Sequence, residues 1–511
     1  MANEFSILLL PVDRPRVSQL IFFILGCLTT AAFAPFGWSL LAPVVLLPFL
    51  YICLTNSPRD SAKHAFWFGF GLFLTGTYWI YISVAVFGKA PVWIALMLMV
   101  GLVLLMSLYF WLTGWLISRL ASGEPWRLLA AAPAAWVLVE WARGWLLTGF
   151  PWMTLGYSQV DSVFAGWAPV LGVYGVSALL ILTVAAILVA ILRRGRQQWI
   201  ALAIIVLPGL CGAILKTVDW TRPAGEAITA SIIQGGISQD QKWLTKHFQP
   251  TLDFYREATR EVANSDIVVW PEVAIPSATG RPSVDNFIDA LESDSRTTGQ
   301  TILFGVLEVV TERTIEPKVH NSIVALNGEV RQVYRKRHLV PFGEYFPVPA
   351  NVREWMRMQS LPYSDLSAGE NEQALIETRA GIALAVAICY EDAFGAEQLY
   401  AMPDAGLLIN VSNDAWFGDS IAPHQHLQIA RMRALEVGRY SVRATNTGIS
   451  AFIGPDGKIL QQGAQFVPAK MTLKVEPMQG STPYARNGNR FILSLCVLIL
   501  AGFWLRGRAN F

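Results

Sequence analysis

Long apolar stretches recur along the first 217 residues of this 511-residue chain, and one more lies near its end. A helix needs about 20 mostly apolar residues to cross the hydrocarbon core of a bilayer. The candidate stretches are residues 18–34, 38–54, 65–87, 91–118, 127–147, 166–192, 198–215 and 490–505. The sequence therefore predicts a polytopic α-helical membrane domain with about eight transmembrane helices. Glu140 and Arg143 interrupt the fifth stretch, and their spacing would put them on one face of a helix, where they could pair.

The charged residues are distributed very unevenly along the chain. Residues 1–217 contain 18 charged side chains, whereas residues 218–485 contain 54, with an excess of acid. Over the whole chain 15% of residues are charged, against about 25% in soluble proteins. This pattern excludes a single soluble globule and a disordered chain, and it disfavours a basic nucleic-acid-binding protein. We expect a seven-helix membrane domain over 1–217, a large water-facing domain over 218–485 and a C-terminal transmembrane helix over 486–511.

The basic residues of the short connections favour one orientation. Cytoplasmic loops of membrane proteins carry an excess of Lys and Arg. With eight spans, the basic connections all fall on one side: Arg14 and Arg16, Arg59 and Lys63, Arg119 and Arg127, Arg193 to Arg196, and Arg506 and Arg508. We therefore expect both termini in the cytoplasm and residues 218–485 on the opposite side of the membrane, with the first stretch retained as a span.

Residues 218–485 have the pattern of an α/β domain with a layered sheet core. The expected strands are 228–234, 266–270, 301–305, 321–326, 382–388, 406–411 and 449–453. The expected helices are 249–263, 284–297 and 424–438. Asn327-Gly328 and Pro455-Asp456-Gly457 are typical of hairpin turns.

Cys389 is the only one of the five cysteines within residues 218–485. This part of the chain therefore has no internal disulfide, and the chain has no Cys-x-x-Cys zinc spacing. Cys389 follows the apolar run 382–388 and precedes the polar residues Tyr390, Glu391 and Asp392. A lone cysteine is most often a buried structural residue. The polar residues at the end of a buried strand favour a nucleophile here.

Three further charged residues lie at predicted strand ends or in apolar surroundings. Glu272 follows a strand and a proline, where a carboxylate can serve as a general base or simply as a loop or helix-terminal acid. Lys336 lies in a basic run that could be a solvated surface or could supply a cation to an oxyanion. Glu344 lies among Pro, Phe and Tyr residues, where an unpaired carboxylate would be costly.

As a set, the segments Trp270–Pro276, Tyr334–Lys336 and Ile388–Glu391 resemble the signature blocks of the carbon–nitrogen hydrolase, or nitrilase, superfamily. The resemblance implies an αββα sandwich over roughly 225–477. It also implies that Glu272 is the base, Lys336 the oxyanion partner and Cys389 the nucleophile.

Two further features narrow the resemblance to the apolipoprotein N-acyltransferase family. They are the flanking apolar stretches and the blocks at 338–344, 411–419 and 430–436. That family transfers an acyl chain from a membrane phospholipid to the N-terminal amine of a diacylglyceryl-cysteine lipoprotein, and the chemistry fits a cysteine thioester and ping-pong steps. The resemblance implies supporting or substrate-binding roles for Glu344, Tyr390, Glu391, Trp243 and Asn321. It calls for no metal or organic cofactor and for no partner chain, so we expect a monomer.

Two alternative functions remain open from the sequence. One is a membrane-anchored amidase or nitrilase that hydrolyses a small nitrogen compound, and the other is a transporter or receptor with an inactive outer domain. We also expect the apolar segment 341–366 to be either a lid at the bilayer surface or ordinary packing. His424 and His426 have metal-like spacing, but we interpret them as structural, because no third ligand or carboxylate partner is evident.

Overall fold

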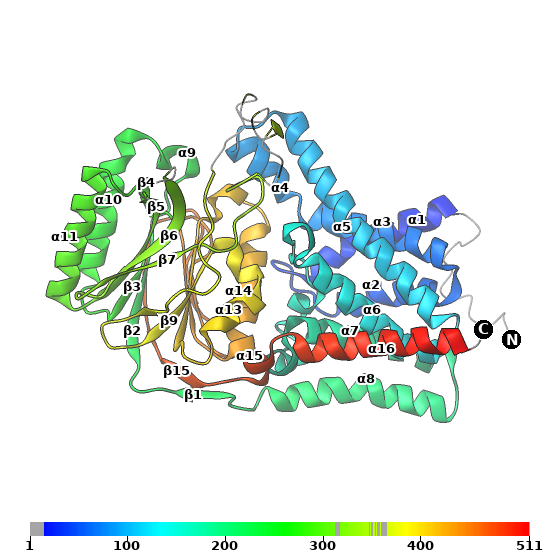
Figure 1. Cartoon of the computed structure of the whole chain (residues 1–511). Coiled ribbons are helices and arrows are strands. Elements are labelled where there is room, and N and C mark those ends of the chain that lie inside the picture. Colours follow the sequence, from blue (N-terminus) through cyan, green and yellow to red (C-terminus); the bar gives the residue numbers. More distant parts are fainter. Residues whose placement is uncertain are drawn as a thin grey trace. The chain divides into compact units, whose positions relative to one another are not determined.

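The computed structural model describes residues 15–311, 317–346, 348, 351, 352, 354, 358 and 365–509 (Figure 1). The chain forms two compact units. The helical unit comprises residues 1–78, 96–218 and 487–511, and the α/β unit comprises Trp79–Ala95 and Asp219–Arg486. The α/β unit thus includes Trp79–Ala95, a segment that the apolar pattern had placed with the membrane helices.

Each predicted apolar stretch contains helix. The helices are α1 (Pro15–Thr29), α2 (Leu41–Thr55), α3 (Pro58–Gly76), α5 (Val92–Ala121), α6 (Pro125–Arg143), α7 (Ala168–Leu192), α8 (Arg196–Leu215) and α16 (Arg490–Ala509). Within the described residues, three helical segments are long and apolar enough to cross a membrane: Val92–Ala121, Val163–Leu192 and Arg196–Leu215. A bent pair, Pro58–Gly76 with Trp79–Phe87, would make a fourth. The structure therefore agrees with a membrane protein, but it does not confirm the count of eight.

Glu140 and Arg143 of α6 are both buried, and each is bound to the loop that follows the helix. The Glu140 carboxylate accepts hydrogen bonds from Leu155 N at 2.8 Å and from Trp136 Nε1 at 3.3 Å. Arg143 donates to the carbonyl oxygen of Phe150 at 2.7 Å. Within the described residues, no direct ion pair joins Glu140 to Arg143. The two side chains share a helix face, but each forms hydrogen bonds with the following loop.

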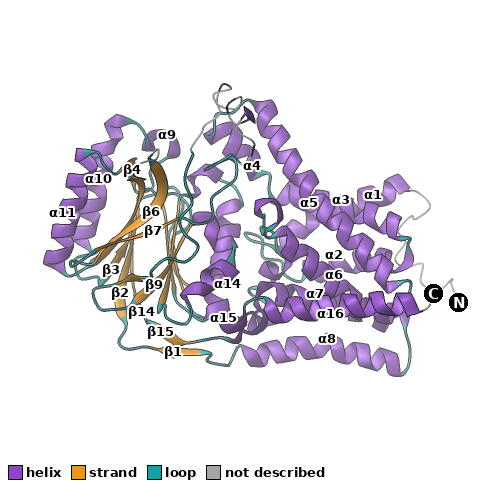
Figure 2. Cartoon of the chain, viewed as in Figure 1, coloured by secondary structure: helices purple, strands orange, loops and turns teal. Residues whose placement is uncertain are grey.

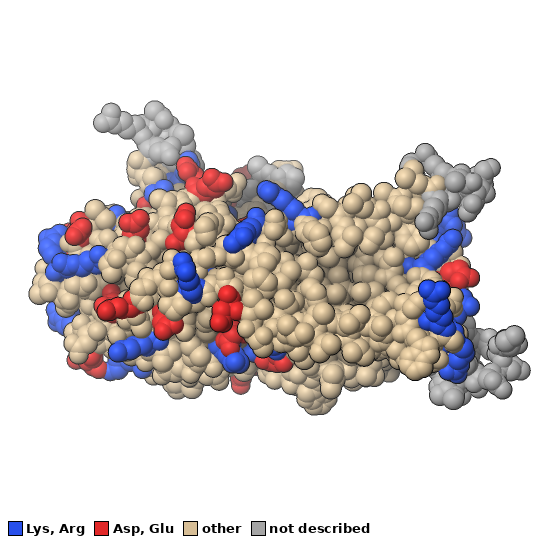
Figure 3. Space-filling view, turned by 90° about the horizontal axis from the view of Figure 1, so that it is seen from below, with Lys and Arg blue, Asp and Glu red and all other residues tan. Residues whose placement is uncertain are grey.

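Three connections that carry basic residues meet at one end of the helical unit. Ser118 at the end of α5 donates to Asn56 O at 3.0 Å, between α2 and α3. Arg193, which follows α7, donates to the Glu124 carboxylate at 3.1 Å, just before α6. Figure 3 shows Lys and Arg gathered at that end, next to a broad surface free of charged side chains. A membrane-embedded helix bundle with one basic side has this appearance.

The α/β unit contains two large sheets. The first has the strand order β13 (Ile459–Gln462), β12 (Ala451–Ile453), β11 (Ser441–Thr445), β10 (Leu407–Ser412), β9 (Ala383–Ile388) and β8 (Ile376–Glu377). The second has the order β14 (Ala469–Val475), β2 (Ile228–Gln234), β3 (Ile267–Val269), β5 (Thr301–Val310), β6 (Lys318–Leu326) and β7 (Arg331–Arg335), with β4 (Ile275–Ala278) paired to β5. The central strands β9–β10–β11 and β2–β3–β5 are parallel. Their carboxyl ends therefore lie at one edge of each sheet.

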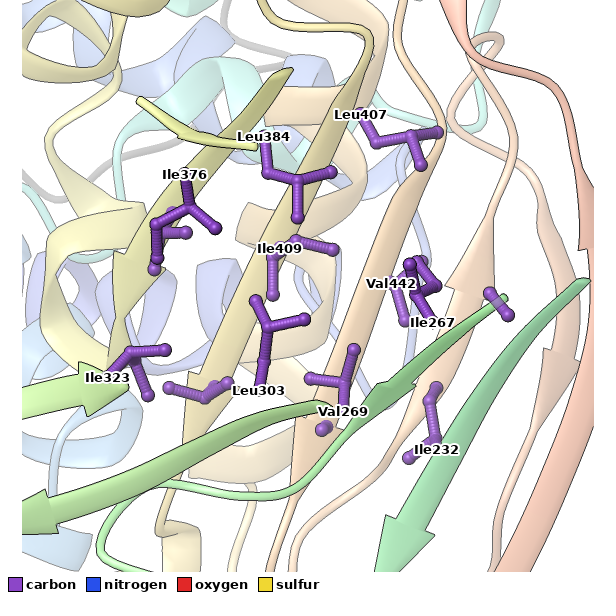
Figure 4. Close-up of a cluster of buried hydrophobic side chains, with 14 of the residues drawn as sticks. Ile232, Ile267, Val269, Leu303, Ile323, Ile376, Leu384, Leu407, Ile409 and Val442 are labelled. Carbon is purple, nitrogen blue, oxygen red and sulfur yellow. The ribbon is translucent and has the colours of Figure 1, made fainter. Parts of the chain in front are cut away.

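The core lies between the two sheets (Figure 4). Alternate residues of each strand point inward, so aliphatic side chains such as Val269 and Leu303 of one sheet meet Leu384 and Ile409 of the other. Helices α10 (Thr245–Glu261) and α11 (Pro282–Thr298) cover the outer face of one sheet. Helices α13 (Gly395–Gln398) and α14 (Ala422–Val437) lie on the other side, as Figure 2 shows by its separate layers of helix and strand. The predicted αββα sandwich is present.

Local sequence explains most of these elements. The Asn327-Gly328 turn joins β6 to β7 with Gly328 at φ +84°, and the turn at Gly457 joins β12 to β13, as predicted. The short strands β1 (Thr221–Pro223) and β15 (Met478–Gly480) pair with each other where the chain enters and leaves the unit.

The segment Trp79–Ala95 packs within the α/β unit through α4 (Trp79–Tyr81) and the π-helical turn Ile82–Phe87. Trp79 Nε1 donates to Gln425 Oε1 at 3.3 Å, and the Trp79 ring lies 4.8 Å from the Phe417 ring. Ser83 donates to Trp416 O at 2.8 Å. These contacts reach the short helix Asp414–Phe417, which follows β10 at the candidate site.

Candidate active site

Three of the residues singled out in the sequence lie just beyond strand ends. Glu272 follows β3, Lys336 follows β7 and Cys389 follows β9. Glu272 and Lys336 are buried, at 7% and 1% exposure, and their charged atoms lie 3.6 Å apart. The fold therefore brings together side chains that are 64 and 117 positions apart in the chain.

The Glu272 carboxylate is fixed from two sides. Its Oε1 accepts a hydrogen bond from Asn321 Nδ2 at 2.7 Å, and its Oε2 accepts one from Asn413 N at 2.8 Å. Gly305 of β5 permits this position, because a Cβ there would lie 2.2 Å from Val273 N. Only glycine lets β5 approach the Glu272 segment so closely.

Lys336 lies between two carboxylates. Its Nζ donates to Glu344 Oε1 at 2.9 Å and lies 3.6 Å from Glu272 Oε1. Burial by itself would lower the pKa of the Lys336 ammonium, but the charges of Glu344 and Glu272 outweigh it and raise the pKa. Asn321 Nδ2 also donates to Glu344 at 3.0 Å, so it bridges the two carboxylates. The ammonium therefore stays charged in a position fixed by three side chains.

Cys389 has a backbone φ of +54°, an uncommon conformation for a residue with a side chain. Burial and the nearby Glu272 charge raise the pKa of the Cys389 thiol, against the opposing charge of Lys336 and a hydrogen bond with Ser412. The resting thiol is therefore protonated at neutral pH. Because the thiolate is the reactive form, nucleophilic attack needs a base. The charges of two carboxylates, Glu272 and then Asp414, act on the thiol, and that of Glu272 has the larger effect.

Glu391 joins the Lys336 segment to the Cys389 segment. Its buried carboxylate accepts hydrogen bonds from Arg337 N at 2.7 Å, from Ile388 N at 2.6 Å and from Tyr334 Oη at 3.1 Å. Burial raises the pKa of this carboxyl, and the backbone N–H donors oppose the shift. Glu391 therefore stabilises the structure of the site. It holds the end of β9 before Cys389, through Ile388 N, and the backbone after Lys336, through Arg337 N.

Tyr390 and Trp243 lie in different surroundings. Tyr390 is mostly buried, and its ring lies 5.0 Å from Phe394 and 5.8 Å from His338. Trp243 follows the short helix α9 (Gln239–Lys242) and is 51% exposed. The predicted set therefore includes a compact polar cluster and one tryptophan at the surface.

Lys242 is a neighbour of the site that the sequence analysis did not single out. It is 3% exposed, and its Nζ donates to the backbone oxygen of Glu272 at 3.3 Å. Burial lowers the pKa of Lys242 to about 8, although the Glu272 charge opposes this shift. Its place in the polar run Gln239–Lys242 gave no sign of burial.

Asp414 and His426 also lie beside Cys389. One ligand atom from each of the three residues lies within 4.8 Å of the others. The Asp414 oxygens already accept hydrogen bonds from His426, Ser412 and Arg443, so this cluster is a hydrogen-bonded network. The sequence analysis found no carboxylate partner for His426, and that was wrong, because Asp414 lies 3.0 Å away.

The apolar segment 341–366 is described only in part, and Trp355, Met356, Leu361 and Tyr363 lie outside the described residues. Within the described part, Phe346 is buried, whereas Met358 is 71% exposed. The choice between a lid and ordinary packing stays a prediction.

Comparison with known proteins assigns the chain to a family. Residues 25–186 match the family model for the apolipoprotein N-acyltransferase N-terminal domain, and residues 229–473 match the carbon-nitrogen hydrolase model. An apolipoprotein N-acyltransferase of Methylococcus capsulatus is 40% identical over 95% of this chain and 95% of its own length. The chain belongs to the apolipoprotein N-acyltransferase family. A Nitrosomonas europaea protein of the same name is 40% identical over 94% of this chain and 96% of its own.

Among solved structures, Saccharomyces cerevisiae Nit3, of the nitrilase superfamily, aligns with 50% of this chain and 91% of its own, at 19% identity and a TM-score of 0.38. The family assignment rests on the full-length relatives, which match both units. The protein is therefore an acyltransferase with a carbon–nitrogen hydrolase domain, and the amidase and inactive-receptor alternatives are not favoured.

Proposed function

We propose that this apolipoprotein N-acyltransferase works through a thioester on Cys389, with Glu272 as the base and Lys336 as the cation for the oxyanion. The observation that carries the proposal is that the half-buried Cys389 thiol lies beside a fixed carboxylate, Glu272, and an ammonium, Lys336, that is paired with Glu344. A protonated thiol is inert unless a base takes its proton.

The first half-reaction forms the thioester. Glu272 takes the proton of Cys389, and the thiolate attacks an ester carbonyl of a membrane phospholipid. Lys336 and the backbone N–H of Tyr390 stabilise the oxyanion. The carbon–oxygen bond then breaks, the lysophospholipid oxygen receives the proton from Glu272, and the acyl chain stays on sulfur.

The second half-reaction forms the amide. The N-terminal amine of a diacylglyceryl apolipoprotein attacks the thioester carbonyl, and the same donors stabilise the oxyanion. Glu272 takes a proton from the amine and returns it to the departing Cys389 sulfur. One ester bond has been exchanged for one amide bond, with no net change in protons or electrons, as expected for ping-pong catalysis.

The remaining residues have supporting roles in this proposal. Glu344 and Asn321 hold Lys336 and Glu272 at their spacing through contacts of 2.7–3.0 Å. Glu391 holds the two segments that carry Lys336 and Cys389. Tyr390 supplies the oxyanion N–H, and the exposed Trp243 offers an aromatic surface to a lipid, in keeping with the preference of tryptophan for membrane interfaces.

For the membrane arrangement, we propose eight spans in the bacterial inner membrane, with the α/β unit in the periplasm and a monomeric chain. Helices occur at all eight apolar stretches, and the basic connections meet at one end of the helical unit. Cysteine-substitution labelling at Lys63 and Gly225, with a membrane-impermeant maleimide on intact cells, tests this orientation. We expect labelling at 225 and none at 63, and the reverse pattern would overturn it.

Intact-protein mass spectrometry after mixing with phospholipid tests the function. We expect an acyl adduct on Cys389 that disappears when a diacylglyceryl peptide with a free amine is added, with the acyl chain recovered as an amide. Cys389→Ser should carry no thioester. An adduct that forms from a small amide and not from phospholipid would support an amidase instead.

A further inference from the structure

His426 of α14 lies between a carboxylate and the backbone of the proposed nucleophile. Its Nδ1 is 3.0 Å from Asp414 Oδ1, and its Nε2 is 3.1 Å from the backbone oxygen of Cys389. His426 is 1% exposed, as is Asp414. Both ring nitrogens therefore face oxygen atoms in a place that bulk water does not reach.

The Cys389 carbonyl oxygen can only accept a hydrogen bond, so Nε2 of His426 is the donor to it. Nδ1, on the other side of the ring, faces a carboxylate oxygen of Asp414. Asp414 is suited to pair with a cation, because the charges of His426 and Arg443 lower the pKa of its carboxyl, although burial alone would raise it.

The charged groups around His426 come from several elements. Asp414 precedes α14 and is bound by Arg443 Nη2 of β11 at 3.0 Å. Asp392, which follows Cys389, lies 3.5 Å from Arg443 Nη1. Asp392, Asp414, Arg443 and His426 thus form one buried polar network, in which a single unpaired charge would be strongly unfavourable.

The hydrogen bond from His426 acts on a specific peptide group. The Cys389–Tyr390 peptide bond is trans, so the Cys389 C=O and the Tyr390 N–H point in opposite directions. A donor that fixes the carbonyl therefore fixes the direction of the N–H. A hydrogen bond to the carbonyl oxygen also draws electron density from the peptide, which makes the N–H at its other end a stronger donor.

We propose that the Asp414–His426 pair orients and polarises the Cys389–Tyr390 peptide, so that the Tyr390 N–H is aimed at the oxyanion of both half-reactions. His426 is a positioning residue in this account, because it acts through its hydrogen bonds with Asp414 and with the backbone oxygen of Cys389. It also holds the backbone of Cys389 in its uncommon positive-φ conformation. The inference rests on the proposed thioester mechanism and adds a residue and a role that the motif resemblance did not supply.

Two reactions of Cys389 distinguish this role from a general structural one. Acylation by phospholipid passes through an oxyanion, whereas alkylation by iodoacetamide displaces iodide from carbon and forms no oxyanion. Both reactions need the same sulfur. The test measures both single-turnover rates at Cys389 by peptide mass spectrometry in the full-length protein, for the wild type, His426→Leu and His426→Gln.

For His426→Leu we expect acylation to slow by about 10- to 100-fold. Outright removal of an oxyanion donor slows other enzymes by about 10²–10³-fold, and misdirecting the donor should cost no more than the lower end of that range. Alkylation should change much less than acylation. His426→Gln can still donate to the Cys389 carbonyl, so its acylation rate should lie between those of the wild type and His426→Leu.

Acylation of His426→Leu at the wild-type rate would overturn the proposal, and so would an equal loss of acylation and alkylation. Identical loss in His426→Gln and His426→Leu would overturn the hydrogen-bond role. Failure of the thioester mechanism itself looks different, because the wild type would then be alkylated at Cys389 but never acylated by phospholipid.

Discussion

Lys336 Nζ lies 2.9 Å from Glu344 Oε1, closer than its 3.6 Å separation from Glu272 Oε1. The ammonium is thus paired mainly with a carboxylate that has no proton to move in the proposed mechanism. This pairing leaves Glu272 available to act as a base while its neighbour Lys336 remains charged. In a simple Lys–Glu pair, one carboxylate would have to balance the ammonium charge and also act as the base. Here Glu344 balances the charge of Lys336, and Glu272 is left to act as the base.

Glu344→Gln should slow acylation of Cys389 by about 10²-fold, the scale of a displaced oxyanion donor. The variant removes the negative charge that holds Lys336 in place. The ammonium would then pair with Glu272, and a carboxylate paired in this way is a weaker base for the Cys389 proton. Single-turnover acylation by phospholipid measures the effect. Glu308→Gln is a matched control, because Glu308 pairs with Arg335, one residue before Lys336, at 2.7 Å. Equal losses in both variants would contradict the specific role of Glu344.

Replacing Glu272 should change two reactions of Cys389 in opposite directions. The Glu272 charge helps to raise the pKa of the Cys389 thiol, so Glu272→Gln should lower that pKa. At a fixed alkaline pH, iodoacetamide alkylation of Cys389 should therefore become faster, because more thiolate is present. Acylation should be lost, because the base is gone.

The measurement is the pH profile of alkylation at Cys389. In the wild type the rate should keep rising with pH beyond the range near 8.5 in which an ordinary cysteine titrates. In Glu272→Gln the profile should shift to lower pH. A shift to higher pH would show that Glu272 favours the thiolate in the resting enzyme and would contradict the assignment.

The sequence predicted the sandwich, and it pointed to the residues of the candidate site because these lie in short blocks at strand ends. Glu272, Lys336 and Cys389 each follow a run of apolar residues, and an apolar strand points its next polar residue out of the core at a sheet edge. The hydrogen-bond partners of these residues were harder to predict. Asn413, which binds Glu272, comes from a loop 141 positions away, and no local pattern connects the two residues.

Strand β11 and the carboxylate partner of His426 were not predicted, for a related reason. Strand Ser441–Thr445 contains Arg443, which looks like a surface residue until its buried partner Asp414 is known. His426 lacked a visible carboxylate because Asp414 is 12 positions upstream on a different element. The count of membrane spans also stayed unconfirmed, since α1, α2 and α16 contain only short apolar segments of 10–17 residues.

Gly305→Ala should damage activity more than stability. The new Cβ would lie 2.2 Å from Val273 N and 2.7 Å from Pro271 O, so the Glu272 segment must move. Overpacking of this kind costs about 1–3 kcal/mol, which a domain of this size can survive. We expect a folded protein with strongly reduced acylation, measured by thermal unfolding and single-turnover labelling. Gly101→Ala is the control, since nothing lies within 4 Å of its added Cβ.

Glu391→Gln should lower stability and acylation together. The Glu391 carboxylate accepts hydrogen bonds from the backbone N–H groups of Arg337, His338 and Ile388. A glutamine has only one acceptor oxygen and would turn an NH₂ group toward N–H donors, leaving buried donors unpaired at about 1–3 kcal/mol. Thermal unfolding should show the loss. Tyr334→Phe removes only the hydroxyl donor at 3.1 Å and should be milder in both measurements. A Glu391→Gln protein with wild-type stability and no acylation would instead place Glu391 among the groups that contact substrate.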